Sequence, residues 1–204
     1  MSLHSALIKQ FRCPQGFLGI LAGRVMATRQ SNLQRNLWTV DLLDLQPDDR
    51  VLELGPGPGV TLSVILDKLP NGFVVGVDHS ATMLRQCEKK NRRDLDAGRL
   101  KLLEGNFTEL PELPGVFDKI LAVNSLQFDA MNPEALKQVV RYLTDDGTLA
   151  ITFQPRGQDA SNEKAREFGE KLAAFLTQAG LARTRLEILP MQPVSAVCVL
   201  AQRA

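Results

Sequence analysis

Residues that hold metals or form covalent frameworks are scarce in this sequence of 204 residues. Three cysteines, Cys13, Cys87 and Cys198, lie far apart without C-x-x-C spacing, and there are only two histidines. A structural zinc site needs closely spaced Cys and His ligands, and a disulfide framework needs paired cysteines in a short chain. The composition therefore argues against both, and it predicts reduced cysteines and no bound metal.

Long apolar runs and a net charge of one sign are also missing. No stretch of about 18 apolar residues occurs, and the N-terminus has no apolar segment after a basic start, so we expect neither a membrane span nor a signal peptide. With 24 basic and 23 acidic residues, the chain has no overall field that attracts nucleic acid. We expect a soluble, cytoplasmic protein without a nucleic-acid partner, and the sequence indicates no oligomeric state.

The most informative stretch is residues 51–59, which read VLELGPGPG. An apolar run containing Glu53 precedes Gly55, Gly57 and Gly59, and helical spacing resumes after the last glycine. This order predicts a buried strand, a tight loop and a helix start. Glycines let a ligand approach the backbone, and a helix start offers unpaired N–H groups. The loop is therefore a candidate nucleotide cradle, with a dinucleotide, another cofactor and an empty turn as alternatives.

Strand and helix patterns alternate from Pro47 onwards. The expected strands lie near Arg50–Leu54, Phe73–Asp78, Leu100–Glu104, Phe117–Val123 and Thr148–Phe153. The expected helices lie near Val60–Leu69, Ala81–Leu95, Pro133–Leu143 and Asn162–Ala179, with a turn at Asp145-Asp146-Gly147. Repeated units of this kind predict an α/β fold with a doubly wound, mostly parallel sheet. Two final runs, Thr184–Leu189 and Ser195–Ala201, have no helix between them and should pair antiparallel.

The N-terminal segment, residues 1–46, differs from the rest of the chain. Its apolar spacing predicts two or three short amphipathic helices, one of them capped by Ser31 or Asn32. The segment is basic, and a solvated helical face explains this more simply than an anion site. The basic residues are Lys9, Arg12, Arg24, Arg29 and Arg35, against Asp41 and Asp44. No linker marks a second domain, so we expect residues 1–204 to form a single domain.

Asp78 ends the second expected strand, 23 residues after Gly55. An acid about 20 residues after the first glycine of such a loop accepts hydrogen bonds from ribose hydroxyls. The alternative is an N-terminal cap for the following helix, although Ser80 already suits that role. The spacing therefore makes Asp78 the main candidate for ribose binding.

Three stretches together resemble the cofactor-contacting motifs of the class I S-adenosylmethionine-dependent methyltransferases. They are Glu53 to Gly59, Val77-Asp78-His79-Ser80 followed by Met83-Leu84, and Gly105-Asn106-Phe107. The resemblance implies S-adenosylmethionine as cofactor and a seven-stranded Rossmann-like sheet whose last strand is antiparallel. It also implies that residues 47–204 form the cofactor-binding core and residues 1–46 a helical cap or substrate lid. By position, Glu53 orients the ammonium group, the loop glycines contact the methionine moiety, and Asp78 holds the ribose.

Further cofactor contacts follow from the same resemblance. Many family members have Gly-Asp-Ala after the third strand, whereas here Asn106 can accept a hydrogen bond from the adenine amino group and Phe107 can add apolar contact. An ordinary turn asparagine is the alternative for Asn106. His79 and Met83 are expected at the cofactor rim, and Asn124, after the fourth strand, is expected to face the sulfonium and the acceptor.

No residue stands out as a general base. The titratable candidates are His4, His79, Asp129 and Tyr142, and none has a supporting constellation. Methyl transfer from a sulfonium is an in-line displacement that positioning and water exclusion can drive, so the catalytic residues stay undefined. The loop at Arg156-Gly157 is a candidate lid, with a plain solvated loop as the simpler alternative.

The favoured hypothesis is an S-adenosylmethionine-dependent methyltransferase acting on a small, partly apolar acceptor. Phe11, Phe17, Met26 and Trp38 would make its acceptor pocket apolar. An RNA or protein methyltransferase and a non-catalytic S-adenosylmethionine-binding protein are the alternatives. A nicotinamide dehydrogenase is disfavoured, because the third glycine lies one residue too early for the dinucleotide motif.

Overall fold

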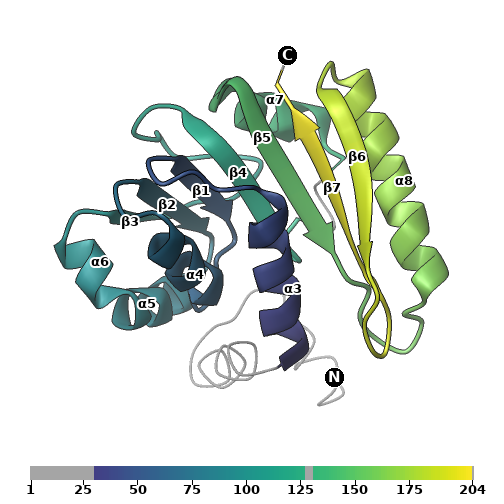
Figure 1. Cartoon of the computed structure of the whole chain (residues 1–204), viewed down its shortest axis with the longest axis horizontal. Helices are drawn as coiled ribbons and strands as arrows, with labels where there is room; N and C mark the ends of the chain where they lie inside the picture. Colours follow the sequence, from purple (N-terminus) through teal and green to yellow (C-terminus); the bar gives the residue numbers. More distant parts are fainter. Residues whose placement is uncertain (1–29, 127–130, 204) are drawn as a thin grey trace.

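The computed structural model of the chain describes residues 30–126 and 131–203, and these form one seven-stranded sheet with helices on both sides (Figure 1). The strand order is β3-β2-β1-β4-β5-β7-β6. The strands are β1 (Arg50–Leu54), β2 (Phe73–Asp78), β3 (Leu100–Glu104), β4 (Phe117–Val123), β5 (Leu143–Phe153), β6 (Ala182–Leu189) and β7 (Ala196–Gln202).

The first five strands run parallel, and β7 pairs antiparallel with both β5 and β6. This confirms the mostly parallel sheet and its antiparallel last strand. The order reverses between β1 and β4, because β2 and β3 extend to one side of β1 while β4 and β5 lie on the other. Ligands of open α/β sheets bind at such a reversal, beyond the carboxyl ends of the strands.

The helices form two layers, each packed on one face of the sheet (Figure 1). They are α3 (Gln30–Leu42), α4 (Val60–Lys68), α5 (Ala81–Lys90), α6 (Arg92–Asp96), α7 (Pro133–Arg141) and α8 (Asn162–Gln178). Alternate residues of a strand enter opposite layers, as the two-residue period of a strand requires. Val51 packs in the cluster with α3, α4 and α5, and Leu52 packs in the cluster with α7 and α8.

Strands β1 to β4 have the predicted bounds, whereas two predictions about neighbouring segments were wrong. Asp145-Asp146-Gly147 lies inside β5 and not in a turn before it, because Leu143 already pairs with Phe117. The strand absorbs the turn sequence through a register shift and a left-handed Asp146 with φ of 64°. The helix expected over 81–95 breaks at Asn91 into α5 and α6.

In the N-terminal segment, the described part is α3 and the loop after it. The predicted cap was wrong, since both Ser31 and Asn32 lie within α3. Val40 and Leu43 join the cluster around α4, which ties α3 to the core. The helices expected over residues 1–29 lie outside the described residues, as do His4, Phe11, Phe17, Met26 and Asp129.

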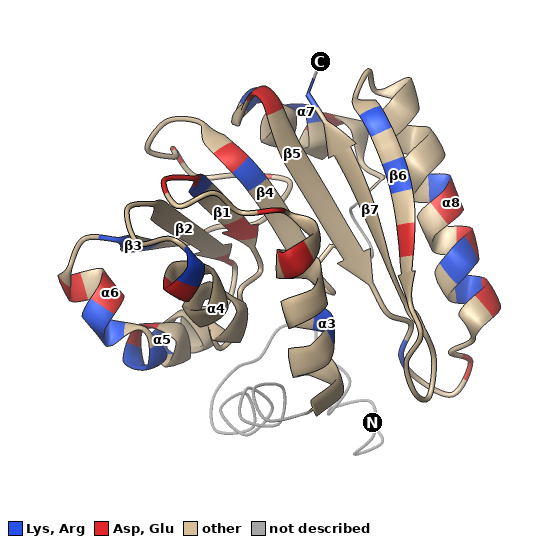
Figure 2. Cartoon of the chain, viewed as in Figure 1, with Lys and Arg blue, Asp and Glu red and all other residues tan. Residues whose placement is uncertain are grey.

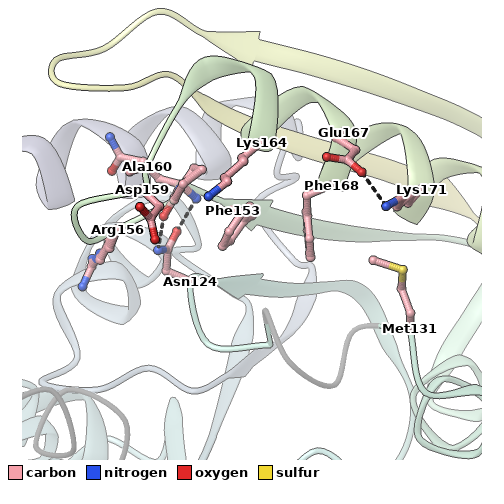
Figure 3. A pocket seen from close by; sticks show the side chains of 12 residues that line it. Asn124, Met131, Phe153, Arg156, Asp159, Ala160, Lys164, Glu167, Phe168 and Lys171 are labelled. Atoms are coloured by element: carbon pink, nitrogen blue, oxygen red, sulfur yellow. Dashed lines mark hydrogen bonds and ion pairs between the residues drawn. The ribbon is translucent and has the colours of Figure 1, made fainter. Parts of the chain in front are cut away.

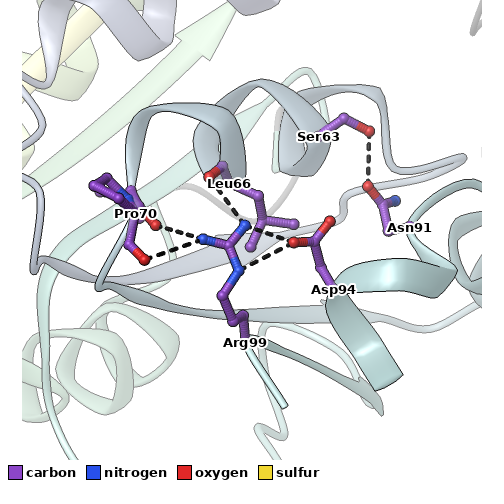
Figure 4. A network of polar contacts seen from close by, with 7 residues as sticks. Ser63, Leu66, Pro70, Asn91, Asp94 and Arg99 are labelled. Carbon is purple, nitrogen blue, oxygen red and sulfur yellow. Dashed lines mark hydrogen bonds and ion pairs between the residues drawn. The ribbon is translucent and has the colours of Figure 1, made fainter. Parts of the chain in front are cut away.

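Arg99 joins three segments at the end of the sheet that carries β3 (Figure 4). Its guanidinium donates to the carbonyl oxygens of Leu66 and Leu69, at the C-terminal end of α4, and pairs with Asp94 in α6. The carbonyls at a helix C-terminus have no partner within the helix, and a cation there also meets the negative end of the helix dipole. Arg99 therefore holds α4 and α6 together away from the glycine loop.

Charged residues are concentrated on the outer helices α5, α6 and α8, and the middle of the central strands contains few of them (Figure 2). In the described part of the chain, no helix is long and apolar enough to cross a membrane. No group of His, Cys, Asp and Glu among the same residues has the arrangement of a metal site.

Candidate functional site

The three loop glycines all have positive φ, with values of 74°, 55° and 77° at Gly55, Gly57 and Gly59. Their surroundings differ. A Cβ on Gly55 would lie 2.3 Å from Cβ of Ser125, and one on Gly59 would lie 2.4 Å from Sγ of Cys87. A Cβ on Gly57 would have no described atom within 4 Å. The outer two glycines are therefore required by close packing within the protein, and only Gly57 faces open space.

Asp78 fastens the glycine loop to the end of β2. Its Oδ2 accepts a hydrogen bond from the Gly57 N–H at 2.9 Å, and its Oδ1 accepts from the Ser80 N–H at 2.9 Å. Burial raises the pKa of Asp78, and the two backbone donors and the neighbouring His79 oppose that rise. Each carboxylate oxygen can accept two hydrogen bonds, so two acceptor positions are left for a ligand. The cap of α5 is Ser80, whose hydroxyl accepts from the Met83 N–H, so Asp78 is not needed as the helix cap.

Glu53 lies at the bottom of the same site. It is 1% exposed, and its Oε2 has no hydrogen-bond partner among the described residues. Burial raises the pKa of Glu53 to about 8, which a hydrogen bond from Thr61 partly offsets. A buried carboxyl oxygen without a partner is costly, and a cationic donor such as an ammonium group would satisfy it. This unpaired acceptor therefore fits the ammonium group of S-adenosylmethionine.

The residues expected around the adenine ring and the cofactor rim lie at the ends of β2 and β3 and in the first turn of α5. Oδ1 of Asn106 accepts from the Thr108 and Glu109 N–H groups, both at 2.8 Å, which is the geometry of a turn asparagine. Phe107 and Met83 are both buried. His79 is about half exposed, with Nδ1 3.7 Å from Oδ1 of Asp78, at the rim of the site.

The end of β4 is fixed by two contacts that span long stretches of sequence. The side-chain amide of Asn124 donates to the Gln154 carbonyl oxygen at 2.9 Å and accepts from the Gln154 N–H at 2.8 Å. These two hydrogen bonds continue the pairing of β4 with β5 beyond the end of β4. The Ser125 hydroxyl donates to the Leu54 carbonyl oxygen, just before the glycine loop. Asn124 thus joins β4 to β5, and Ser125 joins β4 to the loop.

Asn91 is a further site residue that the sequence analysis missed. It is buried, its amide donates to the Gly59 carbonyl oxygen at 3.2 Å and to the Cys87 carbonyl oxygen at 3.0 Å, and it accepts from the Ser63 hydroxyl at 2.7 Å (Figure 4). No local pattern marks this role, because Gly59 lies 32 residues away. Asn91 holds the last loop glycine from the corner between α5 and α6.

A cavity of about 580 Å³ opens beside Asn124, at the carboxyl ends of β4 and β5 (Figure 3). The first residues of α8 and the loop before it form its other side. Phe153 and Phe168 make an apolar wall with ring centroids 4.2 Å apart. Arg156, from the predicted lid loop, lines the cavity and donates to Oδ1 of Asn32 in α3 at 3.0 Å.

Two residues expected near the acceptor lie elsewhere. Trp38 does not line this cavity, since it is half-buried and packs against the hydrophobic cluster around α4, so its place in an acceptor pocket stays a prediction. Tyr142 caps the C-terminus of α7, and its carbonyl oxygen accepts from the Phe117 N–H at the start of β4. Because this is the opposite end of the strands from the glycine loop, Tyr142 is excluded as a general base.

The glycine loop, Asp78 and the cavity all lie at the carboxyl ends of strands around the reversal between β1 and β4. This arrangement defines a doubly wound α/β protein that binds a nucleotide-type cofactor at that edge. Residues 51–147 match the family model described as a methyltransferase domain. This match and the relatives below support a class I S-adenosylmethionine-dependent methyltransferase, with S-adenosylmethionine as the cofactor.

Individual relatives agree with this assignment. The chain is 29% identical to the uncharacterized methyltransferase YdaC of Bacillus subtilis, over 90% of this chain and 98% of that protein. It is also 29% identical to a trans-aconitate 2-methyltransferase of Rhodopseudomonas palustris, over 67% of this chain but only about half (52%) of that protein. The fold is similar to a SAM-dependent methyltransferase from Aquifex aeolicus, with a TM-score of 0.72, 17% identity and coverage of 91% and 98% of the two chains.

Proposed function

We propose that the chain transfers the methyl group of S-adenosylmethionine to a small, partly apolar acceptor held in the cavity beside β4 and β5. The observation that carries the proposal is the position of this cavity. It is lined by Asn124 at the reversal of strand order, and one of its walls consists of the Phe153 and Phe168 rings. Relatives that are named as methyltransferases of a small organic acid, trans-aconitate, support a small-molecule acceptor.

Within this proposal, three residues hold the cofactor through different chemistry. Glu53 accepts from its ammonium group, and the open space over Gly57 receives its methionine chain. Asp78 uses its remaining acceptor positions for the ribose hydroxyls. Asn106, Phe107, Met83 and His79 lie on the adenine side, where the Asn106 oxygen would exchange one of its turn hydrogen bonds for the adenine amino group. Gly55 and Gly59 set the shape of the loop.

The bound cofactor supplies an electrophilic methyl group, and the chain supplies geometry. Asn124 fixes the end of β4 against β5, and Ser125 fixes it against the glycine loop. These two contacts keep the cofactor side and the acceptor side of the site in a fixed relative position. In-line transfer then depends on holding the nucleophile close to the methyl carbon and keeping water out. Residues 47–204 form the cofactor-binding core in this proposal, and residues 1–46 cover the acceptor side.

Titration calorimetry with S-adenosylmethionine and S-adenosylhomocysteine tests the cofactor half of the proposal. Asp78→Ala should weaken binding by about 1.5–3 kcal/mol, because it removes charge-assisted hydrogen bonds to the ribose. The acceptor half is tested by transfer of labelled methyl from the cofactor to small molecules of a cell extract. Label that appears only in macromolecules would contradict a small acceptor.

A macromolecular acceptor is the second candidate, and the basic N-terminal segment favours it. The first 40 residues contain five Lys and Arg residues and no Asp or Glu. An RNA acceptor would show steeply salt-dependent binding that is lost when residues 1–29 are removed. Binding that does not change with salt would leave the small acceptor as the remaining candidate.

A further inference from the structure

The charges around the acceptor cavity indicate more about the acceptor than its size. This inference rests on the proposed function, since it takes the cavity beside Asn124 to be the acceptor site. The cavity has an apolar wall, Phe153 and Phe168, whose rings are tilted by 39° to each other. Aromatic surfaces of this kind favour a flat or apolar body, which would pack on the Phe153 ring.

Basic groups gather at the end of the cavity nearest α3. Two guanidinium groups donate to the same oxygen, Oδ1 of Asn32: Arg156 at 3.0 Å and Arg35 at 3.3 Å. Arg35 is only 3% exposed, and it also donates to Oε1 of Gln154, at the end of β5, at 2.7 Å. Two positive charges are thus held close together where β5 ends.

The wall formed by α8 adds a third cation. Lys164 lines the cavity and extends from α8 toward it (Figure 3). It has no ion pair within 4 Å among the described residues, although the charges of Lys171 and then Lys164 lower the pKa of Glu167. Lys171 and Glu167, farther along the helix, pair with each other at 2.6 Å, so their charges largely cancel. Asp159 is the remaining acidic residue of the lining, and it is exposed.

We propose that the acceptor is a small organic acid, with a flat or apolar body on the Phe153 and Phe168 wall and an anionic group directed toward Arg156 and Lys164. Guanidinium groups bind carboxylates and phosphates in a two-point geometry, and an ammonium group adds a point charge. An anion at this end would meet the positive charges of Arg156 and Lys164, which both line the cavity. A neutral acceptor of the same shape would leave that electrostatic attraction unused.

The test compares acids with their neutral amides on the full chain saturated with S-adenosylhomocysteine. The probes are benzoate against benzamide and cinnamate against cinnamamide, with affinities measured by ligand-observed NMR. We expect at least one acid to bind at least fivefold more tightly than its amide, and we expect added chloride to reduce this preference. Lys164→Gln and Arg156→Gln should each reduce it further, whereas Lys164→Arg should keep it.

Arg166→Gln is the matched control, because Arg166 lies on the same helix, is exposed and does not line the cavity. The proposal is overturned if the amides bind as well as the acids, if neither acid binds at about 10 mM, roughly tenfold above a millimolar Kd, or if Arg166→Gln acts as strongly as Lys164→Gln. A chain that fails to bind S-adenosylhomocysteine at all contradicts the proposed function instead, so the two failures are distinguishable.

Discussion

The variants Gly57→Ala and Gly59→Ala test two roles of the same loop: Gly59 is required by packing within the protein, and Gly57 leaves space for the cofactor. At Gly57 the new Cβ meets no described atom within 4 Å, so its cost to folding is the strain of a left-handed backbone, about 1–2 kcal/mol. At Gly59 the Cβ would also lie 2.4 Å from Sγ of Cys87 and 2.6 Å from Nδ2 of Asn91. Overpacking of this kind adds about 1–3 kcal/mol to the same strain.

A stability assay and a binding assay should therefore separate the packing role of Gly59 from the cofactor role of Gly57. In urea denaturation, Gly57→Ala should lower the free energy of unfolding by about 1–2 kcal/mol and Gly59→Ala by about 2–5 kcal/mol. In calorimetry with S-adenosylhomocysteine, Gly57→Ala should lose at least about tenfold in affinity, because its methyl group fills space that the methionine chain needs. Wild-type affinity in Gly57→Ala would refute the assignment of that open space to the cofactor. A greater loss of stability in Gly57→Ala than in Gly59→Ala would refute the packing argument.

Four further predictions concern polar groups that are buried or half-buried. Glu53 has a raised pKa of about 8 in the folded chain, so its contribution to stability is largest at low pH and decreases as pH rises from about 4.5 to about 8. In urea titrations at several pH values, Glu53→Gln should make this decrease smaller. The affinity for S-adenosylmethionine should rise from pH 6 to pH 7.5, where more Glu53 is ionised and the ammonium group is still charged, and a flat profile in calorimetry would contradict this pairing. Asn91→Leu should lower the free energy of unfolding by about 1–3 kcal/mol and also weaken S-adenosylhomocysteine binding, because Gly59 loses its support. Arg99→Ala, which removes the hydrogen bonds to the end of α4, should lower the free energy of unfolding by about 1–3 kcal/mol and leave the affinity for S-adenosylhomocysteine unchanged. Equal losses of affinity in Asn91→Leu and Arg99→Ala would show that instability alone weakens binding.

The parts of the fold that local sequence determines were predictable. Strands β1 to β4 have the predicted bounds, because short apolar runs between turn residues mark both their ends. The class of cofactor followed from the resemblance to the class I methyltransferases, whose most specific part is the glycine loop and Asp78 at their mutual spacing. The glycine loop and Asp78 lie within about 25 residues of each other, so a local sequence pattern is enough to detect them.

Features that depend on contacts distant in sequence were not predictable in the same way. The early start of β5 results from the pairing of Leu143 with Phe117, which overrides the turn preference of Asp146 and its neighbours. The requirement for glycine at position 55 comes from Ser125, 70 residues later, and no local pattern indicates that approach. Trp38 is half-buried against the cluster around α4, a position set by the packing of α3 on α4 and not by any local pattern.

The most direct test of the account is a crystal structure of the chain with S-adenosylhomocysteine bound. The account predicts the methionine chain over Gly57, its ammonium group on Glu53 and both ribose hydroxyls on Asp78, with the sulfur atom directed toward the cavity beside Asn124. A ligand bound at another edge of the sheet, or one whose ribose does not contact Asp78, would contradict it.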